Sequence, residues 1–312
     1  MLAHKHITKI VAAVMAAAVC LCLCAVAFSG PLTAWAGDKG IAQEYETALF
    51  DTSSILSVNI QMDEADWNDM LENATAETYY QCNVEVNGTM FYQVGIRPKG
   101  NTSLSAIAND DTTDRYSFKL EFDHYVDGQT CFGLDKLILN NNYADATNLK
   151  EALIYDMYQY LGADASLYNY AKLSVNGEYW GVYLALEAVE DSFPLRNYGV
   201  QDGELYKPDS MNIGGGGDPG GDFKADDMDF GDLDLGDMTP NSVVNDSIDN
   251  AFSGTTFFDT LMENETYHSQ YYAYLQQLVS EYINGGGFDA FYTRVRSQID
   301  TLVESDPTAF YS

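Results

Sequence analysis

The chain has 312 residues, of which 46% are hydrophobic and 13% aromatic, enough apolar material for a sizeable core and hence a globular fold. Its 15 Lys and Arg residues are outnumbered by 47 Asp and Glu residues, which gives a formal net charge of −32. That charge would repel nucleic acid, and no basic stripe offsets it, so nucleic acid is excluded as the partner. The absence of a polybasic patch also excludes charge-driven binding to a membrane surface.

The first 36 residues have the pattern of a secretory signal. Lys5 and Lys9 precede an apolar run over residues 10–28, and Ala34-Trp35-Ala36 matches the small-x-small cleavage pattern. The run is close to the lower limit for a membrane span, so an uncleaved anchor is the alternative. We expect a secreted or cell-surface protein that reaches the membrane only through an uncleaved N-terminal segment.

Two of the five cysteines lie beyond the expected signal. Cys82 and Cys131 would meet an oxidising compartment after export, so they are candidates for a disulfide. Of the histidines beyond the signal, His124 and His268 stand alone, without zinc-ligand spacing. We therefore expect no metal site made of Cys and His.

The first expected elements are a strand over 55–60 and a short helix over 62–71. A β-hairpin follows, in which strands over 80–86 and 90–96 are joined by an Asn87-Gly88 turn. Asn-Gly between alternating apolar runs is the strongest short-range hairpin signal.

This hairpin leads into the stretch Gly95-Ile96-Arg97-Pro98-Lys99-Gly100-Asn101-Thr102-Ser103, which we interpret as an anion-binding turn. Glycines let backbone N–H groups approach a phosphate, Arg97 offers a planar donor fork and Lys99 a point charge. Asn101 and Ser103 add further donors or a helix cap. The alternative is a tight turn with solvated charges, and Asn101 stands where a P-loop would have its lysine.

Three further elements are expected before the next hairpin. A strand over 116–122 alternates cleanly, which directs Lys119 away from the apolar core. A strand over 137–139 runs into Asn140-Asn141-Asn142, a polar triplet that is typical of a turn but can also bind a ligand. A helix over 149–161 follows, and it carries Asp156 on its apolar stripe. We interpret Asp156 as a paired buried carboxylate, with a role in a site as the alternative.

A second Asn-Gly hairpin is expected around Asn176-Gly177, with strands over 170–175 and 179–187. Glu187 ends the second, apolar strand, so we expect its charge to meet a basic partner. Beyond residue 255, apolar spacing predicts two helices that are separated by Gly285-Gly286-Gly287.

Taken in order, these blocks resemble the spore-coat CotH family over roughly residues 55–209. The resemblance rests on the stretch 95–103, Tyr116-Ser117-Phe118-Lys119-Leu120, Leu137-Ile138-Leu139 with the Asn140–Asn142 triplet, Asn176-Gly177-Glu178-Tyr179-Trp180-Gly181-Val182-Tyr183-Leu184 with Glu187, and Glu204-Leu205-Tyr206-Lys207. Family members are secreted or surface atypical protein kinases that use ATP and a divalent metal to phosphorylate proteins on serine. The resemblance implies an α+β, atypical protein-kinase-like fold, with antiparallel hairpins in the N-terminal part and a helical C-terminal part.

The resemblance also implies roles for individual residues. It places Arg97, Lys99 and Lys119 on the nucleotide phosphates, beside the donors Asn101 and Ser103. It makes Glu187 a structural ion-pair candidate. The implied cofactors are ATP and Mg²⁺ or Mn²⁺, and the implied partner is an exported or surface protein substrate.

The catalytic and metal-binding motifs of the family are not found in the sequence. The family has an N-x-D-type segment and a Pro-Trp-Asp motif, but none of the three tryptophans, Trp35, Trp67 and Trp180, is followed by Asp. In their place lies a Gly- and Asp-rich stretch over residues 210–250. We interpret it as a flexible acidic loop at the position of an internal deletion. The metal candidates within it are Asp227, Asp229, Asp232 and Asp234, although no EF-hand spacing is met.

Two readings of function follow from this contrast. The first is a secreted CotH-like kinase that transfers phosphate from ATP to serine of exported proteins. The second is a catalytically inactive pseudokinase or deletion product that at most binds nucleotide. A separate, third reading does not depend on this contrast: 23 Tyr and the signal suggest a surface- or carbohydrate-binding module. The expected organisation is a signal or anchor over 1–36, a CotH-like nucleotide-side region over 50–209, the acidic loop over 210–250 and a helical part over 255–312.

Overall fold

The computed structural model describes residues 40–200 and 256–311, besides Leu205 and a few positions between 11 and 19. The expected signal is covered only at those few positions, and the expected acidic loop lies outside the described residues. None of the helices within the described ranges combines the length and the apolar character that a membrane span requires. The division into regions stays a prediction.

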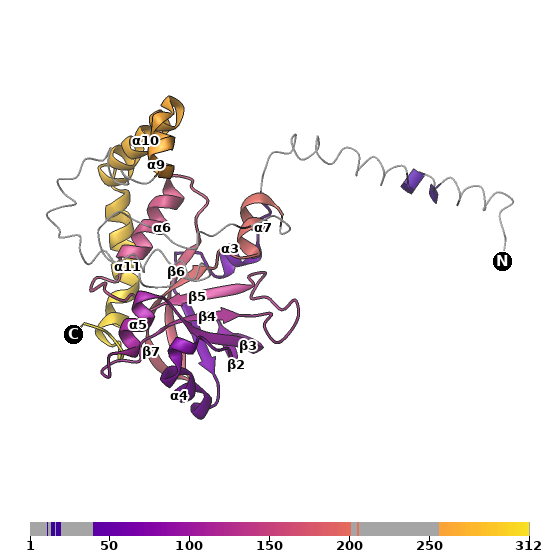
Figure 1. Ribbon diagram of the computed structural model, residues 1–312, viewed down its shortest axis with the longest axis vertical. Helices are drawn as coiled ribbons and strands as arrows, with labels where there is room; N and C mark the ends of the chain where they lie inside the picture. The colour runs from indigo at the N-terminus through magenta and orange to yellow at the C-terminus, as the bar shows by residue number, and fades with distance from the viewer. Residues whose placement is uncertain are drawn as a thin grey trace.

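Seven strands close into a barrel, in the order β1-β2-β3-β4-β5-β7-β6 (Figure 1). Neighbouring strands are antiparallel except β1 and β6, which pair in parallel and close the sheet. The strands are β1 (Leu56–Gln61), β2 (Tyr80–Val86), β3 (Thr89–Lys99), β4 (Ser117–Glu121), β5 (Lys136–Asn140), β6 (Tyr168–Val175) and β7 (Glu178–Glu187).

The closed barrel shows that the expected fold class, an α+β atypical protein-kinase-like fold, is wrong. Both Asn-Gly hairpins are present, as β2–β3 and β6–β7, so the local prediction of these elements is confirmed. The prediction missed the closure, in which Leu56 pairs with Ala171 and Ile60 with Val175. Pairs between residues so far apart in the sequence leave no signal in a local pattern. Closing the sheet gives hydrogen-bond partners to the backbone N–H and C=O groups of both edge strands.

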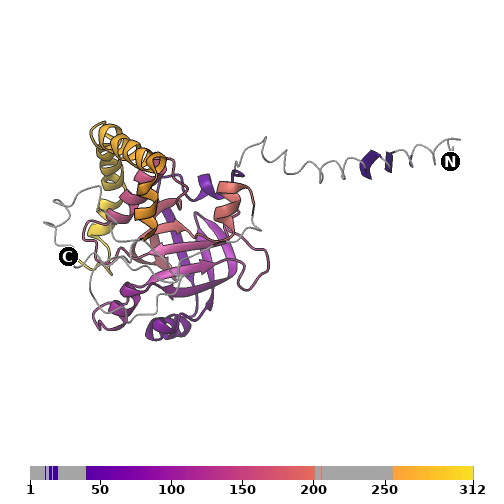
Figure 2. The same ribbon diagram turned by 45° about the horizontal axis from the view of Figure 1, so that its top comes forward.

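The helices flank this barrel, and in Figures 1 and 2 the C-terminal ones gather along one side of it. α4 begins where Asp63 accepts a hydrogen bond from the backbone N–H of Ala65 at 2.8 Å, an N-cap. The helices are α3 (Glu44–Ala48), α4 (Glu64–Glu72), the short 3₁₀ helix η1 (Ala74–Ala76), α5 (Thr102–Ala108), α6 (Lys150–Tyr160), α7 (Ser192–Tyr198), α9 (Thr256–Glu263), α10 (Glu265–Gln277), the π-helix η5 (Leu278–Ile283) and α11 (Gly287–Glu304).

Apolar side chains form two cores, one inside the barrel and one outside it. The inner core takes alternate residues from every strand, such as Ile96, Phe118 and Leu139. The outer core lies where α6 and α11 cover β6 and β7, and its members include Tyr155, Leu184 and Val295. Burial of both faces explains why β7 reads as a continuous apolar run.

Asp156 joins α6 to the C-terminal helices, as the paired-carboxylate interpretation predicts. Its Oδ1 lies 3.0 Å from Nη2 of Arg294, and its Oδ2 accepts a hydrogen bond from the Tyr282 hydroxyl at 2.6 Å. The Tyr168 hydroxyl also donates to Oδ1. Tyr282 lies in the π-helix η5. The wider turn of this helix therefore carries the tyrosine whose hydroxyl contacts Asp156.

The expected disulfide between Cys82 and Cys131 is not formed, because both are free, buried thiols. Cys82 lies on β2 and its thiol donates to the backbone oxygen of Val94 at 3.5 Å. Cys131 lies in the β4–β5 connection, where its backbone pairs with Leu134. Burial raises the pKa of Cys82 to about 12 and raises that of Cys131 as well, which makes both thiols poor nucleophiles.

Candidate nucleotide-phosphate site

The register of β3 and β4 brings the three predicted phosphate-binding cations together. Arg97 lies directly opposite Lys119, and Lys99 opposite Ser117. Opposite residues in a sheet share a face, and Phe118 points into the barrel core, so all three cations lie on the outer face. They are nevertheless only 4–7% exposed.

This arrangement corrects the expected turn. β3 does not end at Ile96 but continues through Arg97 and Pro98 to Lys99. The backbone turns at Gly100, where φ is +125°, and a Cβ there would lie 2.7 Å from Oγ of Ser103. The cations are therefore held on a paired strand, which is more rigid than the loop that the glycine spacing suggests.

β5 adds a fourth cation, which the sequence analysis missed. Lys136 lies opposite Glu121 on β4, and Ile138 lies opposite Lys119. Because residues two apart on a strand share a face, Lys136 stands diagonally next to Lys119, within reach of a long side chain. We call Arg97, Lys99, Lys119 and Lys136 the cation row.

Three carboxylates interleave with the cation row. Glu77, which follows η1, forms an ion pair with Arg97. Glu190, which precedes α7, bridges two lysines: its Oε1 lies 3.4 Å from Nζ of Lys119 and its Oε2 3.5 Å from Nζ of Lys136. Glu121 lies 3.9 Å from Lys136. The row is thus an alternating charge network rather than a bare positive patch.

Burial lowers the pKa of Lys119, and the neighbouring Arg97 and Lys136 act in the same direction. Glu190 opposes the shift but does not cancel it. The protonated amine is therefore only partly compensated by its surroundings, and an added anion would stabilise it.

Two stacked aromatic side chains, Tyr79 and His124, lie beside Arg97 at one end of the row. The rings of Tyr79 and His124 stack with centroids 4.1 Å apart, and the guanidinium of Arg97 lies 5.5 Å from the Tyr79 centroid. The Tyr79 hydroxyl donates to Glu121. Gly95 makes room for the stack, since a Cβ there would lie 2.7 Å from Cβ of His124. The glycine before Arg97 thus serves side-chain packing rather than a turn.

Amide side chains stand at the other end. Asn140 donates its Nδ2 hydrogens to Glu151 on α6, at 2.8 and 3.0 Å. Its Oδ1 is buried and finds no hydrogen-bond partner among the described residues. Asn101 is the N-cap residue of α5 without a capping side-chain hydrogen bond, and Ser103 is buried behind it. The phosphate roles of Asn101 and Ser103 stay predictions.

Glu187 lies away from the row, at one end of the barrel. Its carboxylate pairs with Arg196 at 2.6 Å and accepts the Tyr45 hydroxyl at 2.6 Å. The side chain is 1% exposed, so the ion pair predicted from the sequence is a buried structural one. The carboxylate beside Lys119 is Glu190, three residues further on.

The metal candidates Asp227, Asp229, Asp232 and Asp234 all lie outside the described residues. Within the ranges that are described, no three His, Cys, Asp or Glu side chains gather closely enough to hold a metal ion. The described part of the site therefore offers donors for phosphate but no ligand set for a cation.

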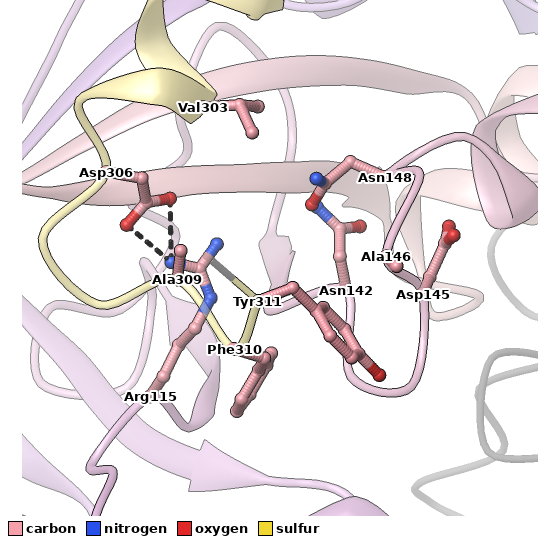
Figure 3. A pocket seen from close by; sticks show the side chains of 10 residues that line it. All are labelled: Arg115, Asn142, Asp145, Ala146, Asn148, Val303, Asp306, Ala309, Phe310 and Tyr311. Atoms are coloured by element: carbon pink, nitrogen blue, oxygen red, sulfur yellow. Dashed lines mark hydrogen bonds and ion pairs between the residues drawn. The ribbon is translucent and has the colours of Figure 1, made fainter.

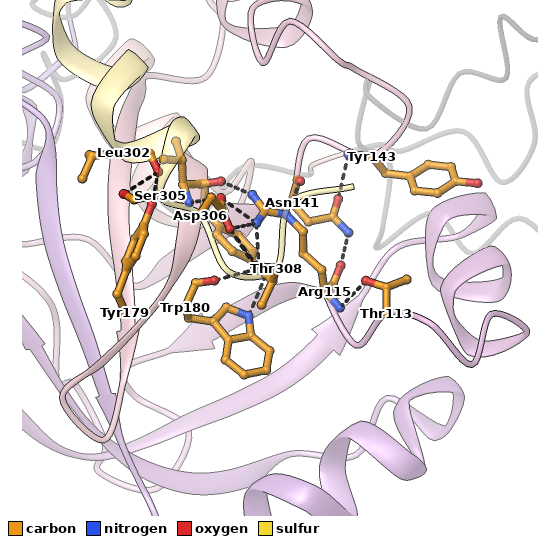
Figure 4. A network of polar contacts seen from close by, with 12 residues as sticks. Thr113, Arg115, Asn141, Tyr143, Tyr179, Trp180, Leu302, Ser305, Asp306 and Thr308 are labelled. Carbon is orange, nitrogen blue, oxygen red and sulfur yellow. Dashed lines mark hydrogen bonds and ion pairs between the residues drawn. The ribbon is translucent and has the colours of Figure 1, made fainter. Parts of the chain in front are cut away.

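A second polar network, around Arg115, was also missed by sequence reasoning. Figure 4 shows its guanidinium between barrel and C-terminus: Nη1 contacts both oxygens of Asp306, at 2.9 and 2.8 Å, and Nε donates to the backbone oxygen of Asn141 at 3.0 Å. Asp306 in turn accepts the backbone N–H of Val182 at 2.8 Å. These partners are far apart in sequence, so no local pattern could have paired them.

A small pocket adjoins this network, between the Asn142–Asn148 loop and the C-terminal residues 309–311 (Figure 3). Its volume is about 30 Å³, enough for water but not for a nucleotide. The Arg115 network therefore fastens the C-terminal segment to the barrel, and the pocket beside it is too small to be a nucleotide site.

Comparison with known families agrees with the resemblance. A family model described as CotH kinase protein matches residues 96–231 and 226–312, which is more than half of the chain. The chain belongs to the CotH kinase protein family. A search of curated proteins finds no match. The matched range of this CotH-family protein contains the whole cation row as well as Arg115 and Asp306.

Proposed function

We propose that this CotH-family protein is an exported kinase that binds the phosphates of ATP on the cation row and transfers phosphate to serine of exported or surface proteins. The observation that carries the proposal is the convergence of Arg97, Lys99 and Lys119 on one outer face of the barrel. Family membership supports the use of ATP and a protein substrate in general.

The donor set suits a polyphosphate. Arg97 offers paired N–H donors and the lysines offer point charges, which together match the oxygens of successive phosphate groups. Two paired strands hold these side chains, so little ordering is needed when the ligand arrives. ATP would supply the phosphoryl group, while the row would hold its phosphates in place and offset their charge.

The N-terminal pattern of Lys5, Lys9, the apolar run and Ala34-Trp35-Ala36 supports export. Secretion and serine specificity are both part of the proposal.

A non-catalytic role is the second candidate. It is favoured by the lack of a Trp-Asp motif in the sequence and of a metal-ligand cluster within the described ranges. A pseudokinase of this kind would keep nucleotide binding on the cation row and lose transfer.

Two measurements test these candidates. We expect Lys99→Ala combined with Lys119→Ala to abolish the thermal stabilisation that ATP gives the wild-type protein. Lys172→Ala is the matched control, because Lys172 is a strand lysine on β6, away from the row. An unchanged ATP-induced shift in the double variant would remove these residues from the site. Transfer of labelled phosphate to casein or to the protein itself, with Mg²⁺ or Mn²⁺, then separates the two candidates: no transfer beside intact ATP binding would leave the pseudokinase.

A further inference from the structure

The Glu190 carboxylate occupies the space between two cations of the row. Each of its oxygens faces one ammonium group, Lys119 at 3.4 Å and Lys136 at 3.5 Å. Charge-assisted N–H···O contacts usually measure 2.7–2.9 Å. Glu190 thus neutralises both lysines without making a tight hydrogen bond to either.

A phosphate group has the same kind of oxygens and a larger charge. An anion that reached Lys119 and Lys136 together would have to take the position that the carboxylate now fills. The two cannot share it, because like charges at such separations repel strongly in a buried setting.

The backbone around Glu190 suits a short displacement. Glu187, three residues before it, is anchored by Arg196 and Tyr45, and Ser192, two residues after it, donates its hydroxyl to Asp135 at 2.5 Å. Between these fixed points Val189 is 37% exposed and the Glu190 side chain 21% exposed. The carboxylate thus borders solvent, while hydrogen bonds and an ion pair hold both ends of its segment.

We propose that Lys136 is a fourth phosphate-binding cation and that Glu190 is an internal counter-ion which an incoming phosphate displaces, so that Glu190 restrains ligand affinity. This inference rests on the proposed phosphate site. It differs from a supporting role for Glu190, in which the carboxylate would hold Lys119 in place for the ligand and its removal would weaken binding.

Calorimetric titration of the full chain with ATP and with inorganic tripolyphosphate, both in EDTA, tests the inference. We expect Glu190→Gln to bind both ligands about tenfold more tightly than wild type and Lys136→Met about tenfold more weakly. The double variant should return close to the wild-type affinity. Glu178→Gln, at the exposed start of β7, is the control and should bind like wild type.

Weaker or unchanged binding by Glu190→Gln, in a variant that melts like wild type without ligand, would overturn the inference and leave the proposed phosphate site standing. If neither ligand binds to any variant, both proposals fail. Binding by Glu190→Gln alone, with none by wild type, would support the displaced counter-ion and refute ATP binding by the natural chain.

Discussion

Replacing Asp306 by alanine tests whether the Arg115 network fastens the C-terminus to the barrel. The two side chains are 2% and 3% exposed, so the change leaves a buried guanidinium without the carboxylate that faces its Nη1. Removing one partner of a buried pair costs about 3–5 kcal/mol. With an unfolding entropy of about 2.1 cal/mol/K per residue, a chain of 312 residues would then melt about 5–8 °C lower.

Asp300→Ala is the control: Asp300 lies in the last turns of α11, six residues before Asp306, which follows the end of that helix. Asp300 pairs with Arg296 four residues away at 2.5 Å, but those side chains are 41% and 49% exposed. An exposed pair of this kind contributes little to stability, because water and salt screen the two charges. Urea unfolding of both variants gives the comparison. A loss below about 1 kcal/mol for Asp306→Ala, or equal losses for the two, would refute the reasoning, since burial would then not decide the cost.

Two further predictions concern the surroundings of the row. Gly95→Ala should destabilise the protein by about 1–3 kcal/mol in urea unfolding, because the added Cβ meets Cβ of His124 at 2.7 Å; a change within about 0.5 kcal/mol would contradict the close packing. Burial raises the pKa of Asp135 above its ordinary 3.8, so its ionisation costs stability as the pH rises from about 4 through the folded-state pKa. Asp135→Asn should therefore gain stability relative to wild type between pH 4 and 7, and a pH-independent difference would exclude this cause.

Local sequence patterns predicted the hairpins and the outward direction of Lys119, but not the side chains that surround the cations. The Asn-Gly turns fixed both hairpins, and the alternation around Lys119 placed that side chain outside the core. Both features depend on neighbours within a few residues, where pattern and geometry are directly linked.

Barrel closure and the carboxylates of the row depend on contacts between distant segments. Glu190 reaches Lys119 from 71 residues away, and Asp306 reaches Arg115 from 191. The extent of β3 was also missed, because the glycine spacing of residues 95–103 suggested a turn. In the sheet Pro98 pairs opposite Phe118, and β3 runs on to Lys99.

Within the cation row the charged forms of Lys119 and Lys136 differ in stability: nearby carboxylates raise the pKa of Lys136 in spite of its burial, but they do not do so for Lys119. Burying Lys119 beside Arg97 and Lys136 lowers its pKa, which means that the protonated form is destabilised in the fold. An apolar residue opposite Ile138 would avoid that cost and extend the apolar surface of the strand. The sequence instead places a lysine there, and the Glu190 carboxylate faces its ammonium group at 3.4 Å. An anion that reached Lys119 would stabilise its protonated form, and this is the property that the proposed phosphate site needs at that position.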